Sequence, residues 1–368
     1  MKYRLGEICD VVSGGTPSRA TAEFWDGGTN PWIKIGNIQR KYVDEADEYI
    51  TQAGLEGSSA KMLSAGTILF TIFATLGEVG ILTIEACTNQ AIAGITIKNQ
   101  SDILTDYLYY FLKSQKSCIA ALGRGVAQNN INLSILRNFE VPIPDLPMQK
   151  QIVAILDKTA KVVEVRQQQL QQLDELVKAR FVELFGDGNH PHIALIDLII
   201  EGAGLSYGIV QPGDDGTGDM GVLRPVDMVD GKISTASIKY IDRSIGDGFK
   251  KTELYGDELL ITVRGTTGIT ALTDIRFNGM NVTRGIAVVR YDRNKINPVY
   301  LNAYLNTDES QRYIQEHTRG ATLQQINLSD LRVQQIMVPP LALQEQMAAF
   351  IEQTDKSKVV VQDEVNGL

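Results

Sequence analysis

The sequence predicts a mixed α/β (α+β) protein. We expect two similar domains with strand-rich fronts, separated by two long antiparallel helices that form a coiled coil. Three observations predict this class. The chain contains an internal repeat, a long stretch without Gly that carries a seven-residue apolar period, and many short apolar runs split by Gly, Asn and Asp.

The same segment occurs twice in the chain. Residues 124–159 and 319–354 align without a gap at a constant offset of 195, and they are identical at 14 of 36 positions. Composition alone would give identity at roughly one position in fifteen. A solenoid needs short units and more copies of them. The repeat therefore indicates two similar domains, each followed by its own helix.

A long helix is predicted to follow Pro147. The stretch from Met148 to Phe185 contains neither Pro nor Gly. Its apolar residues recur every seven positions at Leu156, Val163, Leu170, Val177 and Leu184, which is typical of a coiled-coil seam. A helix of 38 residues is about 57 Å long and cannot bury such a stripe alone. The second copy offers a shorter seam from Leu343 to Val361, so we expect the two helices to pack antiparallel.

The two larger segments are predicted to mix strands and helices. Short apolar runs at 67–72, 93–97, 258–263 and 286–289 are typical of strands, and the stretches 107–112 and 300–305 are helical. Weaker repeat matches join 33–38 to 223–228 and 75–77 to 266–268. The predicted limits are 1–147 for the first domain, 148–185 for the central helix, 186–341 for the second domain and 342–368 for the distal helix.

Composition limits the class of protein and its compartment. The three cysteines, Cys9, Cys87 and Cys118, are few and widely spaced, and the chain has three histidines. This pattern argues against a disulfide framework and a metal site, and it favours a reducing cytoplasm. No apolar stretch is long enough to predict a membrane span, and the N-terminus lacks the apolar core of a signal peptide. The net charge of −9 argues against binding DNA through phosphate attraction alone.

Several motifs, in order along the chain, resemble the DNA-specificity (S) subunit of type I restriction-modification systems. Residues 13–18, with Phe24-Trp25 and 31–33, resemble the opening of a target recognition domain. Residues 206–213 and 263–268 resemble a second one. The blocks 131–156 and 326–351 resemble the regions that join each recognition domain to its spacer helix. The resemblance covers nearly the whole chain, and the ordered set is more specific than any single motif.

The resemblance implies a non-catalytic subunit that recognises double-stranded DNA and docks methylation (M) subunits and restriction (R) subunits. It implies no cofactor in this chain, with S-adenosylmethionine, ATP and Mg²⁺ held by the partner subunits. Two domains on a rod of fixed length can contact half-sites about one helical turn, roughly 34 Å, apart. Because the two domain fronts differ, we expect an asymmetric bipartite target.

Two alternatives stay open. One is a coiled-coil module that binds proteins and has no DNA role, which the net charge of −9 supports. The other is a single chain that both recognises and methylates or cuts DNA. The segments 142–145 and 338–341 lack the Asn/Asp-Pro-Pro-aromatic run of an adenine methyltransferase, and no G-x-x-x-x-G-K-S/T phosphate-binding loop is present. These missing motifs count against a catalytic chain.

Candidate DNA contacts are side chains able to bond base edges or phosphates, chiefly Arg, Lys, Asn, Gln, Ser and Thr. In the first domain they are Thr16, Ser18, Arg19, Lys34, Asn37, Gln39, Arg40, Lys41, Arg124, Gln128, Asn129 and Asn130. In the second domain they are Arg224, Lys250, Lys251, Arg264, Thr266, Thr267, Arg284, Arg319, Thr322, Gln324 and Gln325. For each of them the competing interpretation is a solvated surface residue or a loop hydrogen bond. Arg264 is the strongest candidate, because Gly265 lets the backbone approach a phosphate closely, and its counterpart in the first domain is Phe73.

Four further polar residues are predicted to belong to the scaffold. Asn132 and Asn327 each precede a helical Leu-Ser pair, so we expect them to cap helices rather than contact DNA. Arg137 and Arg332 occupy matching repeat positions and are predicted to pair with a scaffold carboxylate.

Overall fold

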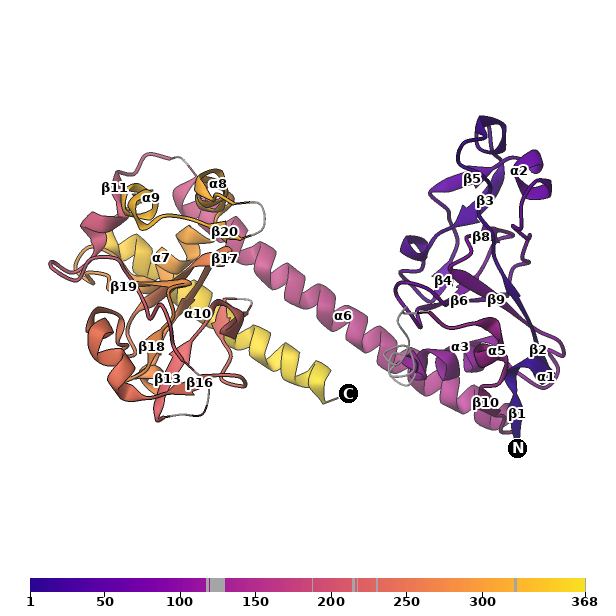
Figure 1. The fold of residues 1–368 in the computed structure, drawn as a ribbon. Helices are drawn as coiled ribbons and strands as arrows, with labels where there is room; N and C mark the ends of the chain where they lie inside the picture. The colour runs from indigo at the N-terminus through magenta and orange to yellow at the C-terminus, as the bar shows by residue number, and fades with distance from the viewer. Residues whose placement is uncertain are drawn as a thin grey trace. The chain divides into compact units, whose positions relative to one another are not determined.

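The computed structural model describes residues 1–116, 119, 130–186, 188–213, 216, 218–229, 231–320 and 323–367. The chain divides into two compact units, Met1–Glu164 and Val165–Leu368, and each is described by itself (Figure 1). The division falls within the long helix α6 (Leu146–Phe185), so each unit keeps part of that helix. The predicted class is confirmed: each unit carries sheets and helices, and two long helices follow the strand-rich parts.

The first unit is built on a five-stranded sheet of order β2-β9-β6-β7-β4 and a three-stranded sheet of order β5-β3-β8. The strands are β2 (Cys9–Ser13), β3 (Asn30–Ile33), β4 (Tyr42–Val43), β5 (Glu48–Ile50), β6 (Ile68–Thr71), β7 (Val79–Leu82), β8 (Cys87–Thr88) and β9 (Ile92–Ile97). Side chains alternate between the faces of a strand. Ile68 and Phe70 of β6 therefore join one core, while Leu69 joins a second core with Ile33 of β3.

The second unit repeats this arrangement with a four-stranded sheet, β12-β19-β17-β20, and a three-stranded sheet, β16-β13-β18. The strands are β12 (Ser206–Tyr207), β13 (Met220–Leu223), β16 (Lys239–Ile241), β17 (Leu259–Leu272), β18 (Asn281–Val282), β19 (Ile286–Val289) and β20 (Gln324–Gln325), with a small pair β14 (Met228–Val229) and β15 (Lys232–Ile233). Strand β13 pairs parallel with β18 and antiparallel with β16, as β3 pairs with β8 and β5. The repeat therefore extends through both domains.

The remaining elements of each domain are short strand pairs and helices. Two short strand pairs lie directly before the long helices: β1 (Lys2–Arg4) with β10 (Glu140–Pro142), and β11 (His192–Ala194) with β21 (Gln335–Met337). The shorter helices are α1 (Leu5–Ile8), α2 (Gln52–Glu56), α3 (Thr105–Ser114), α5 (Leu133–Arg137), α7 (Pro298–Leu305), α8 (Asp308–His317) and α9 (Leu328–Val333). The 3-10 helices are η1 (Ala22–Phe24), η2 (Ile35–Asn37), η3 (Leu195–Leu198), η4 (Pro225–Asp227), η5 (Arg243–Thr252) and η6 (Ile275–Phe277).

Helix α6 begins at Leu146, two residues before the predicted start. Pro147 lies in the first turn, where a missing N–H removes no intrahelical hydrogen bond. The Asp145 carboxylate accepts a hydrogen bond from the backbone N–H of Met148 at 3.0 Å, which caps the helix. The second long helix, α10 (Leu341–Asn366), begins after Pro340. The predicted limits of the domains around these helices stay predictions.

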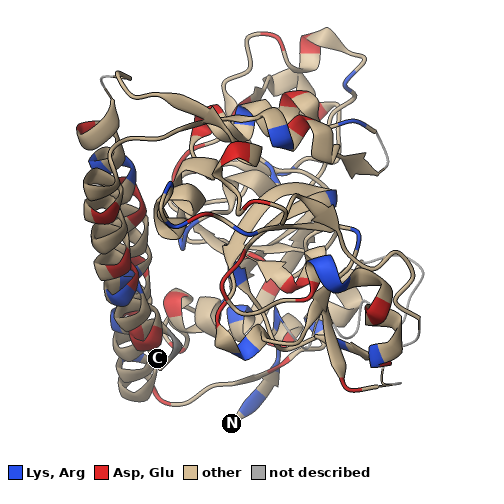
Figure 2. Cartoon of the chain, turned by 90° about the vertical axis from the view of Figure 1, so that its left-hand side faces the viewer, with Lys and Arg blue, Asp and Glu red and all other residues tan. Residues whose placement is uncertain are grey.

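Helices α6 and α10 pack antiparallel, as predicted. Three contacts fix their register: Arg166 Nη2 lies 2.5 Å from Glu364 Oε2, Lys358 Nζ lies 2.7 Å from Asp174 Oδ1, and the Arg180 guanidinium lies 5.8 Å from the centre of the Phe350 ring. Residue numbers rise along one helix as they fall along the other. Figure 2 shows Lys and Arg interspersed with Asp and Glu along this pair. Opposite charges therefore support the apolar seam.

Aromatic side chains anchor the end of α6 in the second unit. The ring of Phe181 stacks on Tyr300 of α7 at 6.1 Å, and the ring of Phe185 meets Tyr300 edge-on at 5.3 Å. The Tyr300 hydroxyl donates to the Met337 carbonyl at 2.9 Å. The helix is therefore joined to the domain that it precedes. Among the described residues, no helix combines the length and the apolar character needed to cross a membrane.

Candidate nucleic-acid interface

Residues shared by the two repeats hold the scaffold. Arg137 Nη2 donates to the Val11 carbonyl at 2.7 Å, and Arg332 Nη2 donates to the Leu205 carbonyl at 2.9 Å. The prediction of a scaffold role is confirmed for both, but the predicted carboxylate partner is wrong. Each guanidinium instead reaches a backbone carbonyl, that of Val11 within β2 or that of Leu205 directly before β12, because a carbonyl without a ladder partner needs a donor.

The repeated asparagines lie at helix starts, as predicted. The Asn132 side chain accepts a hydrogen bond from the backbone N–H of Ile135 at 2.9 Å and caps α5. Asn327 occupies the matching position before α9, but its side chain makes no capping hydrogen bond.

Two predicted cations of the first domain, Arg19 and Lys34, converge on one carboxylate. Arg19 Nη2 lies 2.5 Å from Glu48 Oε2, and Lys34 Nζ lies 2.6 Å from Glu48 Oε1. The hydrogen bond from Lys34 is the main cause that lowers the pKa of Glu48 below its ordinary value. Arg19 acts in the same direction, and burial acts in the opposite one. The Arg19 guanidinium also lies 3.6 Å from the centre of the Trp25 ring. Much of this positive charge is therefore compensated within the domain.

Lys41 joins three elements of the first unit. Its Nζ lies 2.7 Å from Asp106 Oδ1 and 2.6 Å from Asp157 Oδ1, and its side chain is only 17% exposed. The Tyr110 hydroxyl donates to the same Asp157 oxygen at 2.6 Å. Burial acts to lower the pKa of Lys41, but the hydrogen bonds to the two carboxylates outweigh it and raise the pKa. The structure thus gives Lys41 a scaffold role.

The other polar candidates of the first domain are divided between loop hydrogen bonds and solvent. The Asn37 side chain accepts from the Lys34 N–H at 2.9 Å, Gln39 Nε2 donates to the Gly36 carbonyl at 2.9 Å, and the Thr16 hydroxyl donates to Gln90 Oε1. Ser18 and Arg40 are exposed. Asn130 forms a β-bridge with Phe73. Arg124, Gln128 and Asn129 lie outside the described residues.

In the second domain, Arg224 supports a buried carboxylate. Its Nε donates to Asp227 Oδ2 at 3.1 Å and its Nη2 donates to Asp227 Oδ1 at 3.0 Å, while its backbone N–H donates to Oδ2 at 2.8 Å. The Asp227 side chain is fully buried, and a buried charge requires a partner. Arg224 occupies the position that Lys34 has in the first domain. The backbone N–H of Lys34 donates to the Asn37 side chain at the start of η2, as that of Arg224 donates to Asp227 at the start of η4.

The remaining candidates of the second domain differ in exposure. Thr267 is buried and its hydroxyl shares a hydrogen bond with that of Thr318 at 3.0 Å, so that hydroxyl belongs to the scaffold. The exposed candidates are Lys250, Lys251, Thr266, Gln324 and Arg319, and Arg319 Nη2 lies 3.9 Å from Asp330 Oδ2. Thr322 lies outside the described residues.

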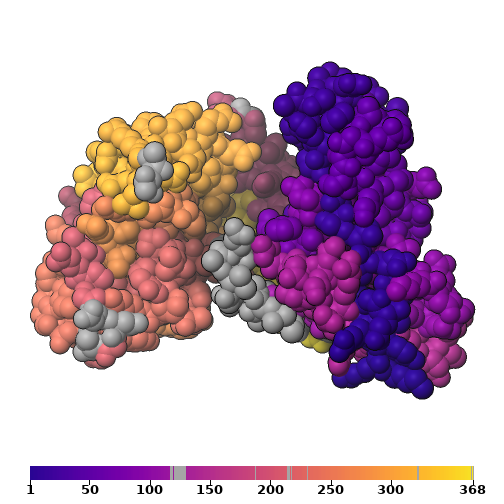
Figure 3. Space-filling view, turned by 45° about the vertical axis from the view of Figure 1, so that its right-hand side comes forward, coloured from indigo at the N-terminus to yellow at the C-terminus, as the bar shows by residue number. Residues whose placement is uncertain are grey.

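Three of the predicted residues meet in one pocket of the second domain. Arg264, Arg284 and Gln325 line a cavity of about 170 Å³ together with Tyr207 and Val210. Arg264 on β17 is the cross-strand partner of Gln325 on β20. Figure 3 shows the segments that carry them, orange for β17 to β19 and yellow-orange for the region of β20, meeting on the surface of the second unit. Sequence reasoning missed Tyr207 and Val210, although both lie in the motif at 206–213.

The two arginines of this pocket carry uncompensated charge. Neither guanidinium forms an ion pair or a side-chain hydrogen bond within the part of the chain that the structure describes. Arg264 is half-buried and Arg284 is exposed, and none of the described residues that line the pocket is a carboxylate. Gly265, with φ of 87°, follows Arg264 directly and gives β17 a left-handed bend at this point. Two unpaired cations at a bend suit an acceptor-rich or anionic ligand.

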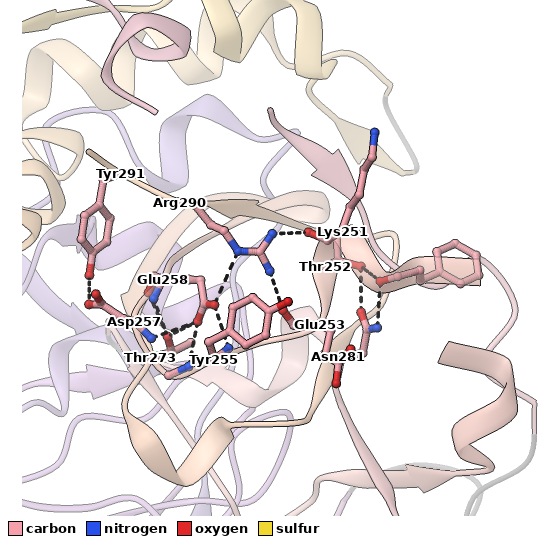
Figure 4. Close-up of polar contacts among 12 residues, drawn as sticks. Lys251, Thr252, Glu253, Tyr255, Asp257, Glu258, Thr273, Asn281, Arg290 and Tyr291 are labelled. Carbon is pink, nitrogen blue, oxygen red and sulfur yellow. Dashed lines mark hydrogen bonds and ion pairs between the residues drawn. The ribbon is translucent and has the colours of Figure 1, made fainter. Parts of the chain in front are cut away.

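A buried carboxylate anchors the start of β17 (Figure 4). Glu258 is 1% exposed, and its carboxylate accepts hydrogen bonds from the backbone N–H groups of Tyr255, Gly256 and Asp257 at 2.8, 3.0 and 3.1 Å. The Thr273 hydroxyl donates to it at 2.9 Å. These bonds fix the loop that precedes β17 and so position the strand that carries Arg264.

Arg290 connects this anchor to η5, which carries Lys250 and Lys251. Its Nε lies 3.7 Å from Glu258 Oε1, and its Nη1 and Nη2 donate to the carbonyls of Lys251 and Glu253 at 2.6 and 2.5 Å. The two exposed lysines are therefore held on a segment that is bonded to the base of β17.

A larger pocket lies elsewhere in the first unit. It has a volume of about 510 Å³, lies beside the start of α6, and is lined by residues such as Met1, Lys98 and Asp145 and by none of the predicted DNA contacts. Among the described residues, no group of three or more His, Cys, Asp or Glu side chains is arranged to hold a metal ion.

Comparison with known proteins gives a consistent family. A family profile described as "Type I restriction modification DNA specificity domain" matches residues 1–175 and 219–364. The EcoR124I/EcoR124II specificity subunit of Escherichia coli is 32% identical over 160 residues, which are 42% of this chain and 39% of that protein. The MjaIX specificity subunit of Methanocaldococcus jannaschii is 22% identical over 376 residues, 95% of this chain and 85% of that protein. The chain thus spans well under half of the first relative and most of the second.

Two solved structures share the fold. The S subunit of a type I restriction-modification system from M. genitalium matches with a TM-score of 0.56 and 14% identity, over 100% of this chain and 92% of that one. A chain from a structural study of complex assembly and conformational transition in the type I system matches with a TM-score of 0.53 and 16% identity, over 100% and 93%. At these identities the likeness shows the fold alone.

Proposed function

We propose a DNA-recognition function for this chain, which belongs to the type I restriction-modification DNA specificity family. In this proposal the chain recognises an asymmetric bipartite target in double-stranded DNA and carries out no catalysis itself. The observation that carries the proposal is the family match over both domains, at 1–175 and 219–364. A specificity function assigned to both halves of one chain supports a target with two halves.

The asymmetry follows from the difference between the two domains. Strands of the two domains pair in matching positions, but the pocket residue Arg264 corresponds to Phe73. A guanidinium donates hydrogen bonds to guanine O6 and N7, whereas a phenyl ring makes apolar contact with a thymine methyl group. Two domains on the same scaffold therefore recognise different half-sites in this proposal.

We further propose that methylation subunits dock on the chain and that restriction subunits join the complex in the cytoplasm. The net charge of −9 supports a need for partners, because DNA affinity depends strongly on Lys and Arg at the phosphates. In this scheme the partner subunits hold S-adenosylmethionine, ATP and Mg²⁺. The purified chain alone should bind DNA poorly at physiological salt and more tightly with a methylation subunit.

The test is a selection from a pool of random duplexes. The full chain is mixed with the methylation subunit of its own system, bound duplexes are recovered on filters and sequenced, and the methylation subunit alone serves as the control. Two enriched blocks of different sequence at a constant spacing are the expected result. Absence of enrichment, or a palindromic motif, would contradict the proposal.

A further inference from the structure

The two domains carry one matched site with opposite chemistry. Resting on the proposed function, we infer that this site determines specificity in each half of the target. The second domain takes the guanine edge of a G·C pair between Arg264 and Arg284, whereas the first takes an A·T pair between Phe73 and Gln90.

The sheet register establishes the first pair of matched positions. Phe73 forms an antiparallel bridge with Asn130, and Arg264 is the antiparallel partner of Gln325. Asn130 and Gln325 are separated by 195 residues, the offset of the sequence repeat. Phe73 and Arg264 therefore occupy the same place at the end of β6 and in β17.

Backbone hydrogen bonds establish the second pair. The Gly15 N–H donates to the Thr88 carbonyl at 2.9 Å, and the Ile209 N–H donates to the Val282 carbonyl at 2.8 Å. Gly15 therefore matches Ile209, and Thr88 matches Val282. One residue after the first pair, Thr16 matches Val210, and two residues after the second pair, Gln90 matches Arg284. Four of the five described residues that line the cavity in the second domain, all but Tyr207, thus have identified counterparts in the first.

In the second domain the site suits a guanine edge. Guanine presents two acceptors, N7 and O6, in the major groove, and a guanidinium donates to both at once. Arg264 and Arg284 line the same cavity with Gln325, and no carboxylate lies among the described residues of its lining. Two like charges held together without compensation repel each other in the free protein. A dense set of acceptors relieves that repulsion.

In the first domain the described counterparts, Phe73, Gln90 and Thr16, carry no charge. Phe73 is 40% exposed although it is a large apolar side chain. Gln90 is exposed, and its Oε1 accepts from the Thr16 hydroxyl, which orients the amide and leaves its NH₂ group as a donor. An A·T pair presents the thymine methyl group and the N7 and N6 groups of adenine in the major groove. Phe73 against the methyl group and the Gln90 amide against adenine match that pattern.

The test exchanges the side chains at the two matched positions of the full chain. Arg264→Phe and Phe73→Arg are each put through the random-duplex selection with the methylation subunit. Arg264→Phe should remove the guanine preference at one or two positions of one block, by about tenfold or more, and leave the other block unchanged. Phe73→Arg should change only the other block. Arg276→Ala, an exposed arginine paired with Asp274 outside the site, is the matched control and should leave both blocks unchanged.

The outcomes separate this inference from the proposed function. An even loss of affinity with both blocks intact would mean that Arg264 contacts phosphate only, and it would overturn the inference, as would an unchanged motif in both variants. If the unsubstituted chain enriches no bipartite motif, the proposed function fails first. Because Arg284 is exposed, Arg284→Gln gives a second variant that leaves the core intact. If Arg264→Phe does not fold, loss of the guanine preference in Arg284→Gln supports the inference and its retention overturns it.

Discussion

The side chain of Gln344 binds the backbone of Asn297, 47 residues away in sequence. Its carbonyl accepts the Asn297 N–H at 2.8 Å, and its amide nitrogen donates to the Pro339 carbonyl at 2.8 Å. Gln344 is fully buried. Since Asn297 caps α7, this single amide fastens the first turn of α10 to the start of α7.

Gln149 forms the same connection in the first domain. It accepts from the Leu104 N–H and donates to the carbonyls of Asp102 and Pro144, each at 2.9 Å. A glutamine amide offers an acceptor and two donors on a reach of three carbons, which a shorter or charged side chain does not. This requirement explains why the two repeats share glutamine at this position.

Replacing this amide should destabilise the second domain. Gln344→Ala leaves a buried N–H and a buried carbonyl without partners, so we expect the free energy of unfolding to fall by about 2–4 kcal/mol. Denaturant unfolding measures the change. Gln346→Ala, an exposed glutamine of the same helix, should change stability by less than about 0.5 kcal/mol. Equal losses in the two variants would contradict the role assigned to Gln344.

Replacing Glu258, whose carboxylate fixes the loop before β17, should lower the free energy of unfolding more than Gln344→Ala does. Glu258→Ala leaves three backbone N–H groups and the Arg290 guanidinium short of their acceptor, and we expect a loss of about 3–5 kcal/mol in the free energy of unfolding. The matched control is Glu253→Ala, because Glu253 contributes only its backbone carbonyl to Arg290. A Glu258→Ala variant as stable as this control would show that the carboxylate does not support the strand.

The cluster at Glu48 should make the first domain sensitive to acid. The pKa of Glu48 is lowered in the folded protein from an ordinary value of 4.5, so the ionised form is favoured by folding. The resulting stabilisation is present above pH 4.5 and is lost as the pH falls through the lower, folded pKa. Glu48→Gln should cost about 1 kcal/mol at neutral pH, since the cluster is partly exposed.

This pH dependence is measured by denaturant unfolding of both proteins from neutral pH into the acid range. The difference between wild type and Glu48→Gln should shrink as Glu48 becomes protonated. Glu45→Gln, an exposed carboxylate on the neighbouring loop, provides the control. A difference that stays constant across the whole range would rule out the ion pairs as its cause.

The antiparallel register of the long helices can be tested by exchanging charges. Arg166→Glu and Glu364→Arg should each destabilise the pair by roughly 0.5 kcal/mol or more, and the double exchange should restore part of the loss, with a coupling of about 0.5–1 kcal/mol. Lys178→Glu combined with Glu364→Arg should show no coupling, since Lys178 lies about 18 Å farther along α6. Coupling in the second cycle but not the first would indicate a different register.

The sequence predicted the helices well because their signals are local. A seven-residue period places Leu156, Leu170 and Leu184 on one face whatever the remainder of the chain does, and all three are half-buried in the structure. The sequence also predicted antiparallel packing, because the second seam begins after the second domain and so brings the C-terminal helix back beside α6. The start of α6 was predicted two residues late, because Pro147 was taken as a boundary when it is tolerated in the first turn.

The sequence by itself determined that there are two domains of one kind, that each is followed by a helix, and that Arg264 differs from its counterpart Phe73. Only the tertiary structure decided which Lys and Arg side chains remain available to bind DNA. Lys41 and Arg264 both looked suited to DNA, but Lys41 meets Asp106 and Asp157, which are far away in sequence. Arg264 lines a pocket with Arg284 and Gln325, and among the described residues that line it there is no carboxylate. Charge is neutralised through space over a few ångströms, so the availability of a cation depends on how the chain folds rather than on its sequence neighbours.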